Sequence, residues 1–131
     1  MYSIDLRFPD DWLSQNRLTT GFLIPPSLKS EWSLIERDAK IALPELLAQV
    51  GHVDIFYHDS DHTYIHQMWE YLTVWPYLLK GGVLASDDIS FNTAFFDLGQ
   101  QTEEKLHVTN RGRNFGFIVR ARAPGKWLPY Y

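Results

Sequence analysis

Hydrophobic and polar residues alternate between residues 53 and 89 in an order typical of an α/β sheet. Short apolar runs at 53–57 and 83–85 predict two strands that are buried on both faces. Between them, residues 63–79 predict a helix, because apolar side chains recur on one helical stripe: Met68, Tyr71, Leu72 and Trp75. Pro76 should kink or end this helix, and Gly81-Gly82 should stop it.

The rest of the chain continues this alternation. Further strands are predicted at 2–6, 32–36, 106–109 and 115–121, and further helices at 39–50 and 94–98. Residues 12–30 read as a loop or a short helix, and residues 110–114 supply the turn of a hairpin. We therefore expect an α/β, Rossmann-like domain over 1–131, with a mostly parallel sheet, helices on both faces and a C-terminal antiparallel hairpin.

Composition narrows the classes of protein that this sequence can encode. The 131 residues are 45% hydrophobic with eight Phe, which predicts one folded domain without long disorder. A net charge of −4 argues against a nucleic-acid partner, despite a small basic group at Arg111, Arg113, Arg120 and Arg122. The chain has no cysteine, no apolar run of membrane-spanning length and no signal-peptide pattern, so we expect a soluble, cytoplasmic protein.

Acidic clusters follow both strands of the strand–helix–strand unit. Residues 58–62 read His-Asp-Ser-Asp-His after the first strand, and Asp87-Asp88 follow the second. Parallel strands end at the same edge of a sheet, where open α/β folds bind their ligands. The two loops should therefore line a single site.

Five motifs occur in the order found in a known family. They are YSIDL, IERDA, DIFYHDSDHTY, LLKGGVLASDDI and the final hairpin. Together they resemble class I S-adenosylmethionine-dependent methyltransferases, in particular the small-molecule O-methyltransferase branch. Residues 54–64 are similar to that branch's D-x-x-x-x-D-G-D-H-x-Y pattern, and an L-x-x-G-G segment and a double acidic end follow. The resemblance implies methyl transfer from S-adenosylmethionine to a hydroxyl of a small-molecule or sugar substrate.

The resemblance also assigns roles to individual residues. Asp5 corresponds to the carboxylate that binds the ribose hydroxyls, and Asp38 to the residue beside the adenine amine, while Asp59 lies at the cofactor and the reacting groups. Asp59, Asp87 and Asp88 correspond to ligands of a divalent cation such as Mg²⁺, with His62 as the base. Simpler readings remain open, because aspartates at strand ends often form turns or helix N-caps.

One feature of the family has no counterpart in this chain. The strand and glycine-rich loop that normally precede the segment similar to residues 2–5 are missing, so we expect an N-terminally truncated domain. Its neighbours should then pair directly, borrow a strand from another subunit or leave an edge exposed. This favours a homo-oligomer, and it raises an alternative function as a non-catalytic binding or assembly module.

The histidines and the acidic loops suggest two other metal sites. His58, His62 and His66, with Asp59 or Asp61, have the residue types of a transition-metal site, although Thr63 stands where zinc hydrolases carry a glutamate. A metal-dependent hydrolase that uses Asp59, Asp87 and His62 is a further reading. The simpler interpretation is that His62 caps the helix and His66 lies on its surface.

Overall fold

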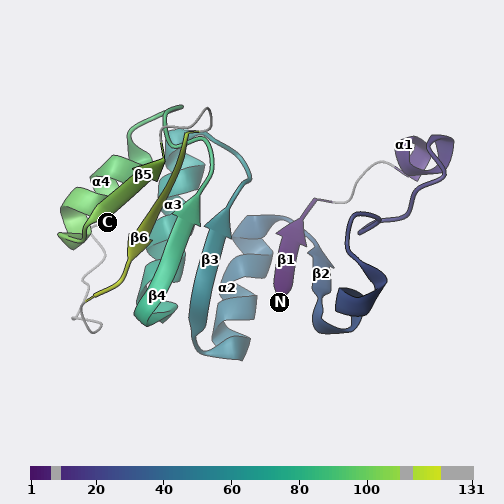
Figure 1. The fold of residues 1–131 in the computed structure, drawn as a ribbon, viewed down its shortest axis with the longest axis horizontal. Coiled ribbons are helices and arrows are strands. Elements are labelled where there is room, and N and C mark those ends of the chain that lie inside the picture. The colour runs from purple at the N-terminus through teal and green to yellow at the C-terminus, as the bar shows by residue number, and fades with distance from the viewer. Residues whose placement is uncertain (7–9, 110–113, 122–131) are drawn as a thin grey trace. The chain divides into compact units, whose positions relative to one another are not determined.

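Strands and helices alternate along the computed structural model, which describes residues 1–6, 10–109 and 114–121 (Figure 1). The chain forms two compact units, Met1–Glu45 and Leu46–Tyr131, and each is considered by itself. A single domain over 1–131 stays a prediction. No helix in the described ranges is long and apolar enough to cross a membrane.

The first unit contains a two-stranded parallel sheet. β1 (Tyr2–Asp5) pairs with β2 (Ser33–Glu36) in a register that runs from Tyr2 opposite Ser33 to Asp5 opposite Glu36. Between these strands lie α1 (Asp10–Gln15) and the 3₁₀ helix η1 (Pro26–Glu31), where the sequence predicts a loop or a short helix. α2 (Ala39–Val50) has the predicted bounds and spans the boundary between the units.

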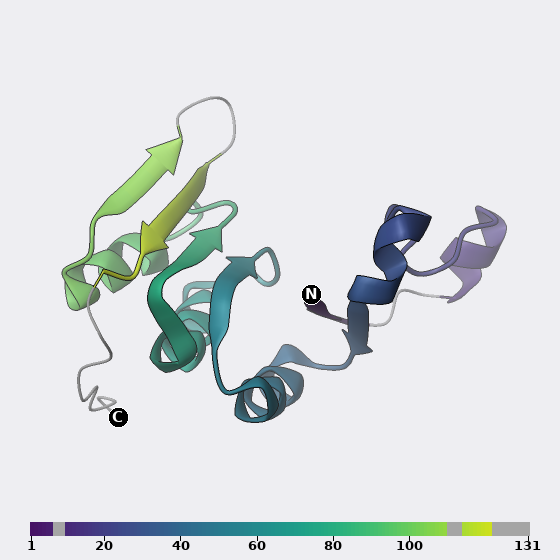
Figure 2. The ribbon, with the colours of Figure 1, turned by 60° about the horizontal axis from the view of Figure 1, so that its bottom comes forward.

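The second unit is built on a four-stranded sheet in the order β3-β4-β6-β5 (Figure 2). β3 (Val53–His58) and β4 (Leu78–Ser86) are parallel, as predicted. β6 (Phe115–Val119) is antiparallel to β4 and to β5 (Leu106–Thr109), which confirms the C-terminal hairpin. Of the predicted turn at 110–114, residues 110–113 lie outside the described residues. The mixed, Rossmann-like α/β fold is confirmed.

The connection from β3 to β4 differs from the prediction at its end. α3 (Tyr64–Val74) stops before Pro76, which lies in the short helix η2 (Trp75–Tyr77), so the predicted helix to residue 79 is too long. Gly81 and Gly82 belong to β4 instead of ending a helix. A glycine is needed at 82 because a Cβ there would lie 2.9 Å from the carbonyl oxygen of Asp54 on the neighbouring strand.

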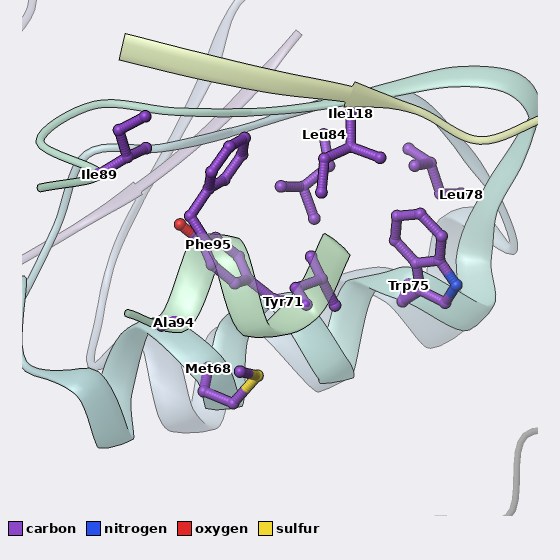
Figure 3. Close-up of a cluster of buried hydrophobic side chains, with 10 residues drawn as sticks. Met68, Tyr71, Trp75, Leu78, Leu84, Ile89, Ala94, Phe95 and Ile118 are labelled. Carbon is purple, nitrogen blue, oxygen red and sulfur yellow. The ribbon is translucent and has the colours of Figure 1, made fainter. Parts of the chain in front are cut away.

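α3 and α4 (Ala94–Thr102) cover one face of this sheet and form its core (Figure 3). The cluster consists of Met68, Tyr71, Trp75, Leu78, Leu84, Ile89, Ala94, Phe95, Leu98 and Ile118. Along β3, Phe56 packs against this cluster while its neighbours Ile55 and Tyr57 are exposed, as strand alternation requires. Val53 also packs against the cluster, because the register shifts between Val53 and Ile55. The core therefore holds α3 firmly under the strands whose ends carry the acidic loops.

Both parallel pairs end in a strand with a single neighbour. Within the described ranges β1 pairs only with β2, and β3 pairs only with β4. Within its own unit, each of these strands therefore has one edge without a partner strand among the described residues.

Candidate functional site

The two acidic loops leave the second sheet at one edge. His58, the last residue of β3, lies opposite Ser86, the last residue of β4. The N–H of Asp87 donates to the carbonyl of His58 over 3.0 Å and extends the contact beyond the strands. The parallel pairing thus brings residues 59–63 and 87–93 to the same edge, as the strand order predicted.

His62 and Asp88 meet across this edge. His62 Nε2 lies 3.8 Å from Asp88 Oδ2, and the two side chains are 21% and 39% exposed. Asp88 has a φ of +48°, and its carbonyl accepts the N–H of Phe91 over 3.1 Å in a tight turn. Asp61 instead accepts the N–H of Thr63 over 2.9 Å, and this bond is the main cause that lowers the pKa of Asp61. His62 therefore faces a carboxylate from the other loop.

The predicted metal ligands are not gathered into a metal site. Among the residues that the structure describes, no group of three or more His, Asp or Glu side chains could hold a metal ion. Asp59 is exposed, and Asp87 and Asp88 are partly buried. The described residues thus do not fit Mg²⁺ at Asp59, Asp87 and Asp88. They also do not fit a transition metal at the histidines, because His58 and His66 are bonded to a glutamate instead.

That glutamate is Glu70, a buried residue of α3. Its carboxylate accepts bonds from His58 Nδ1 at 2.6 Å, from Ser60 Oγ at 2.9 Å and from His66 Nε2 at 2.9 Å. Burial is the largest influence on the pKa of Glu70 and would raise it, but the bonds from His58, Ser60 and His66 together lower it. Glu70 is therefore a buried carboxylate that stays ionised because it has donors on both oxygens.

Two imidazole nitrogens of the site have no hydrogen-bond partner among the residues that the structure describes. They are Nε2 of His58 and Nε2 of His62, and both atoms are buried. The His58 ring meets the His62 ring edge-on, with centroids 5.4 Å apart and planes at 76°. A carboxylate can only accept, so the bond to Glu70 places a proton on His58 Nδ1. In the neutral ring, Nε2 then carries the lone pair.

A second polar network fixes the loop after β4. Ser86 Oγ accepts from Tyr71 over 2.6 Å and from Gln67 over 3.1 Å, and it donates to the carbonyl of Asp87 over 3.0 Å. Asn92 donates to Gln67 over 2.8 Å and to the carbonyl of His62 over 2.9 Å. Burial raises the pKa of Tyr71, which stays a hydrogen-bond donor. These bonds tie α3, β4 and both loops into one rigid unit.

The structure shows which residue caps α3 and where His66 lies. The N-cap of α3 is Thr63, which accepts from the N–H of His66, so the prediction that His62 caps the helix is wrong. Thr63 takes this place because its hydroxyl lies one residue before the first helical residue, Tyr64. His66 is only 14% exposed at its side chain and is bonded to Glu70, so it is not a simple surface residue.

The predicted cofactor residues of the first unit occupy strand and helix ends. Asp5 ends β1 and is exposed, and its Oδ1 accepts the N–H of Leu6 over 2.8 Å. Asp38 precedes α2, and its Oδ1 accepts the N–H of Lys40 over 2.8 Å, which is an N-cap bond. Asp5 and Asp38 therefore make the turn and helix-cap hydrogen bonds that the simpler interpretation expects. Contact of these residues with a cofactor stays a prediction.

Sequence reasoning missed Glu70, Ser86, Gln67 and Asn92. A signal for Glu70 was available, since His66 and Glu70 are spaced i, i+4 on one helix. Glu70 and Gln67 also interrupt the apolar stripe of α3, where a buried polar side chain requires a partner. No comparable signal identifies Ser86 or Asn92.

Comparisons with known proteins agree with this fold. A family model described as a methyltransferase domain matches residues 1–89. The apo structure of CalS11, described as TDP-rhamnose 3'-O-methyltransferase, an enzyme in calicheamicin biosynthesis, has a TM-score of 0.63 and 16% identity. A second structure, described as CalS11, calicheamicin methyltransferase, has a TM-score of 0.57 and 19% identity. At these identities the likeness to the solved structures establishes the fold alone.

The alignments differ in how much of each chain they cover. They include 90% and 76% of this chain, but only 56% and 41% of the two solved chains. No curated protein matches. Because the family model covers more than half of the sequence, this chain belongs to the methyltransferase domain family, among the class I S-adenosylmethionine-dependent methyltransferases.

Proposed function

We propose that this chain takes part in O-methyl transfer from S-adenosylmethionine to a hydroxyl of a small molecule or sugar. The observation that carries the proposal is His62 Nε2, which has no hydrogen bond to the described residues and lies 3.8 Å from Asp88 Oδ2 at the carboxyl edge of β3 and β4. The two neighbouring structures described as sugar or calicheamicin methyltransferases favour this acceptor class.

His62 acts as the general base in the proposed reaction. Bound S-adenosylmethionine supplies an electrophilic methyl group on a sulfonium. With that methyl group supplied to the acceptor oxygen, His62 Nε2 would take up the proton of the acceptor hydroxyl. The Asp88 carboxylate, 3.8 Å away, then stabilises the imidazolium. Asp59, which is exposed at the same edge, helps to orient the reacting groups.

Asp5 and Asp38 are the proposed contacts for the ribose and the adenine of the cofactor. Oδ1 of each carboxylate accepts a backbone N–H, which holds the side chain in place. Carboxylates suit the hydroxyl and amine donors of that half of the cofactor. No step is assigned to Mg²⁺, because the described residues group no set of three ligands.

The first experiment measures binding of S-adenosylmethionine by calorimetry, followed by methyl transfer to TDP-rhamnose. His62→Gln should lower kcat by roughly 10²- to 10⁴-fold, the usual contribution of a general base, with cofactor affinity unchanged. His52→Gln, at an exposed histidine of the same unit, is the matched control and should behave like wild type. Absence of cofactor binding up to millimolar concentration would contradict the proposal.

A binding or assembly module is the second candidate. Among the described residues of its own unit, β1 and β3 each pair with one strand, which favours this candidate, and so do the exposed side chains of Ile55 and Tyr57. This candidate requires a homo-oligomer, whereas methyl transfer does not. Light scattering would measure the mass in solution: an oligomer that binds no S-adenosylmethionine supports the second candidate, and a monomer that binds the cofactor supports the first.

A further inference from the structure

We infer that Glu70 is a positioning residue for His62 and acts through His58. The three side chains form a chain of contacts from the buried face of α3 to the edge of the sheet, through the 2.6 Å bond between Glu70 and His58 and the edge-on contact of His58 with His62. This inference rests on the proposed role of His62 as the base.

Burial of the Glu70 carboxylate in the core is unfavourable by itself. Glu70 is 4% exposed and shares its helix face with the buried residues Met68, Tyr71 and Val74, where an apolar side chain would stabilise the core. A buried carboxylate persists only when donors satisfy it. Glu70 has two imidazoles and a hydroxyl as donors, so its position serves to hold those groups.

Glu70 fixes the orientation of the His58 ring. The bond from Nδ1 fixes both the proton position and the plane of the ring, as a carboxylate does for a catalytic histidine. The ring of Tyr71 meets His58 from another side, with centroids 5.6 Å apart and planes at 73°. His58 is fully buried and cannot reorient, so it forms a rigid edge.

The His62 ring lies against the His58 ring. The ring of His62 contacts His58 at 5.4 Å and Phe91 at 5.5 Å, and the His62 carbonyl accepts from Asn92. With the ring confined between His58 and Phe91, Nε2 lies on the side of Asp88. Loss of the Glu70 bond should free His58 to rotate, and His62 would then lose its orientation.

The test compares variants that break this chain of contacts with one that does not. Glu70→Gln removes an acceptor oxygen, and His58→Asn keeps a short donor toward Glu70 but removes the ring beside His62. Both should lower kcat by roughly 10- to 100-fold with KM for the acceptor unchanged, as for other residues that orient a catalytic group. His66→Asn is the matched control, because it breaks a bond to Glu70 of similar length without contact to His62, and it should keep kcat.

A spectroscopic measurement separates this inference from the proposed function. In ¹H–¹⁵N spectra of the histidine rings, Glu70→Gln should remove the downfield Nδ1–H signal of His58 and shift the ring signals of His62, while those of His107 stay unchanged. If the wild type shows no methyl transfer, the proposed function is wrong. The spectra then still show whether Glu70 orients the His62 ring through His58. Folded variants with unchanged His62 signals would overturn the inference. If Glu70→Gln does not fold, His58→Asn decides by the same His62 signals.

Discussion

Replacement of Arg120 by methionine should strongly destabilise the second unit. Arg120 follows β6 and is 2% exposed. Its Nη1 donates to the carbonyl of Trp75 at 2.5 Å and, through a very short contact, to the carbonyl of Leu78. The guanidinium also lies 5.5 Å from the centroid of the Trp75 indole ring. One side chain thus satisfies the carbonyls where the chain passes from η2 into β4.

The magnitude follows from those acceptors. A buried acceptor left without a donor costs about 1–3 kcal/mol, so two acceptors would cost about 2–6 kcal/mol. The Trp75 carbonyl keeps a second donor, the N–H of Leu78, which reduces its share. We therefore expect Arg120→Met to lower the free energy of unfolding by about 2–4 kcal/mol. Arg120→Lys, which keeps a charged donor without the planar fork, should lose about half as much.

Urea denaturation followed by circular dichroism measures this loss. The matched control is Arg37→Met, which removes an ion pair with Glu45 at 2.7 Å whose side chains are 49% and 60% exposed. An exposed pair contributes only about 0–1 kcal/mol, so the control should be close to wild type. Equal destabilisation by the two substitutions would refute the claim that burial of the Arg120 contacts makes them important.

Three further predictions concern the remaining contacts. The pKa of Glu70 is lowered in the folded state, so its contribution to stability is present above the ordinary carboxyl pKa and is lost as the pH falls through the folded pKa. The difference in unfolding free energy between wild type and Glu70→Gln should therefore shrink in acid, and a pH-independent difference would argue against an ionised Glu70. Asp38→Ala should cost about 0.5–2 kcal/mol by loss of the cap on Lys40, whereas Asp38→Ser keeps the cap. If Asp38 also contacts adenine, both variants should bind S-adenosylmethionine more weakly by calorimetry; normal binding by Asp38→Ser would leave only the cap. Gly116→Ala would place a Cβ 2.7 Å from the buried ring of Phe95, so it should destabilise by about 1–3 kcal/mol, measured as a lower Tm, and an unchanged Tm would show that Phe95 can move aside.

The fold was largely predictable because its elements carry local signals. α2 and β3 have periodic apolar residues and end at glycine or polar residues, so their bounds agree with the prediction to within a residue. The bounds of β4 were predicted too short, because Gly81 and Gly82 were interpreted as the end of the preceding helix. In the structure Gly82 allows close approach to the carbonyl of Asp54, a contact between strands that no local pattern can encode.

The candidate site was predictable only in its location. Parallel pairing of β3 and β4 brings the loops that contain His62 and Asp88 to one edge, and this follows from element order. The contacts between individual side chains at this edge do not follow from element order. The family resemblance implied that Asp59 and Asp87 are metal ligands, but the described residues form no such group, because ligand convergence depends on backbone direction after the strand.

The polarity of α3 explains why Glu70 escaped a reading based on periodicity. Its buried face has the polar residues Gln67 and Glu70 and the hydroxyl of Tyr71 among the apolar residues Met68 and Val74. α3 follows β3 and precedes the parallel strand β4, so its N-terminal half lies at the carboxyl edge. The buried polar groups therefore gather where the strands end, with Gln67 and Tyr71 bonded to Ser86 and Glu70 bonded to His58. Polar residues on the buried stripe of α3 thus indicate that this helix supports the site, even when the partners of those residues cannot be named from the sequence.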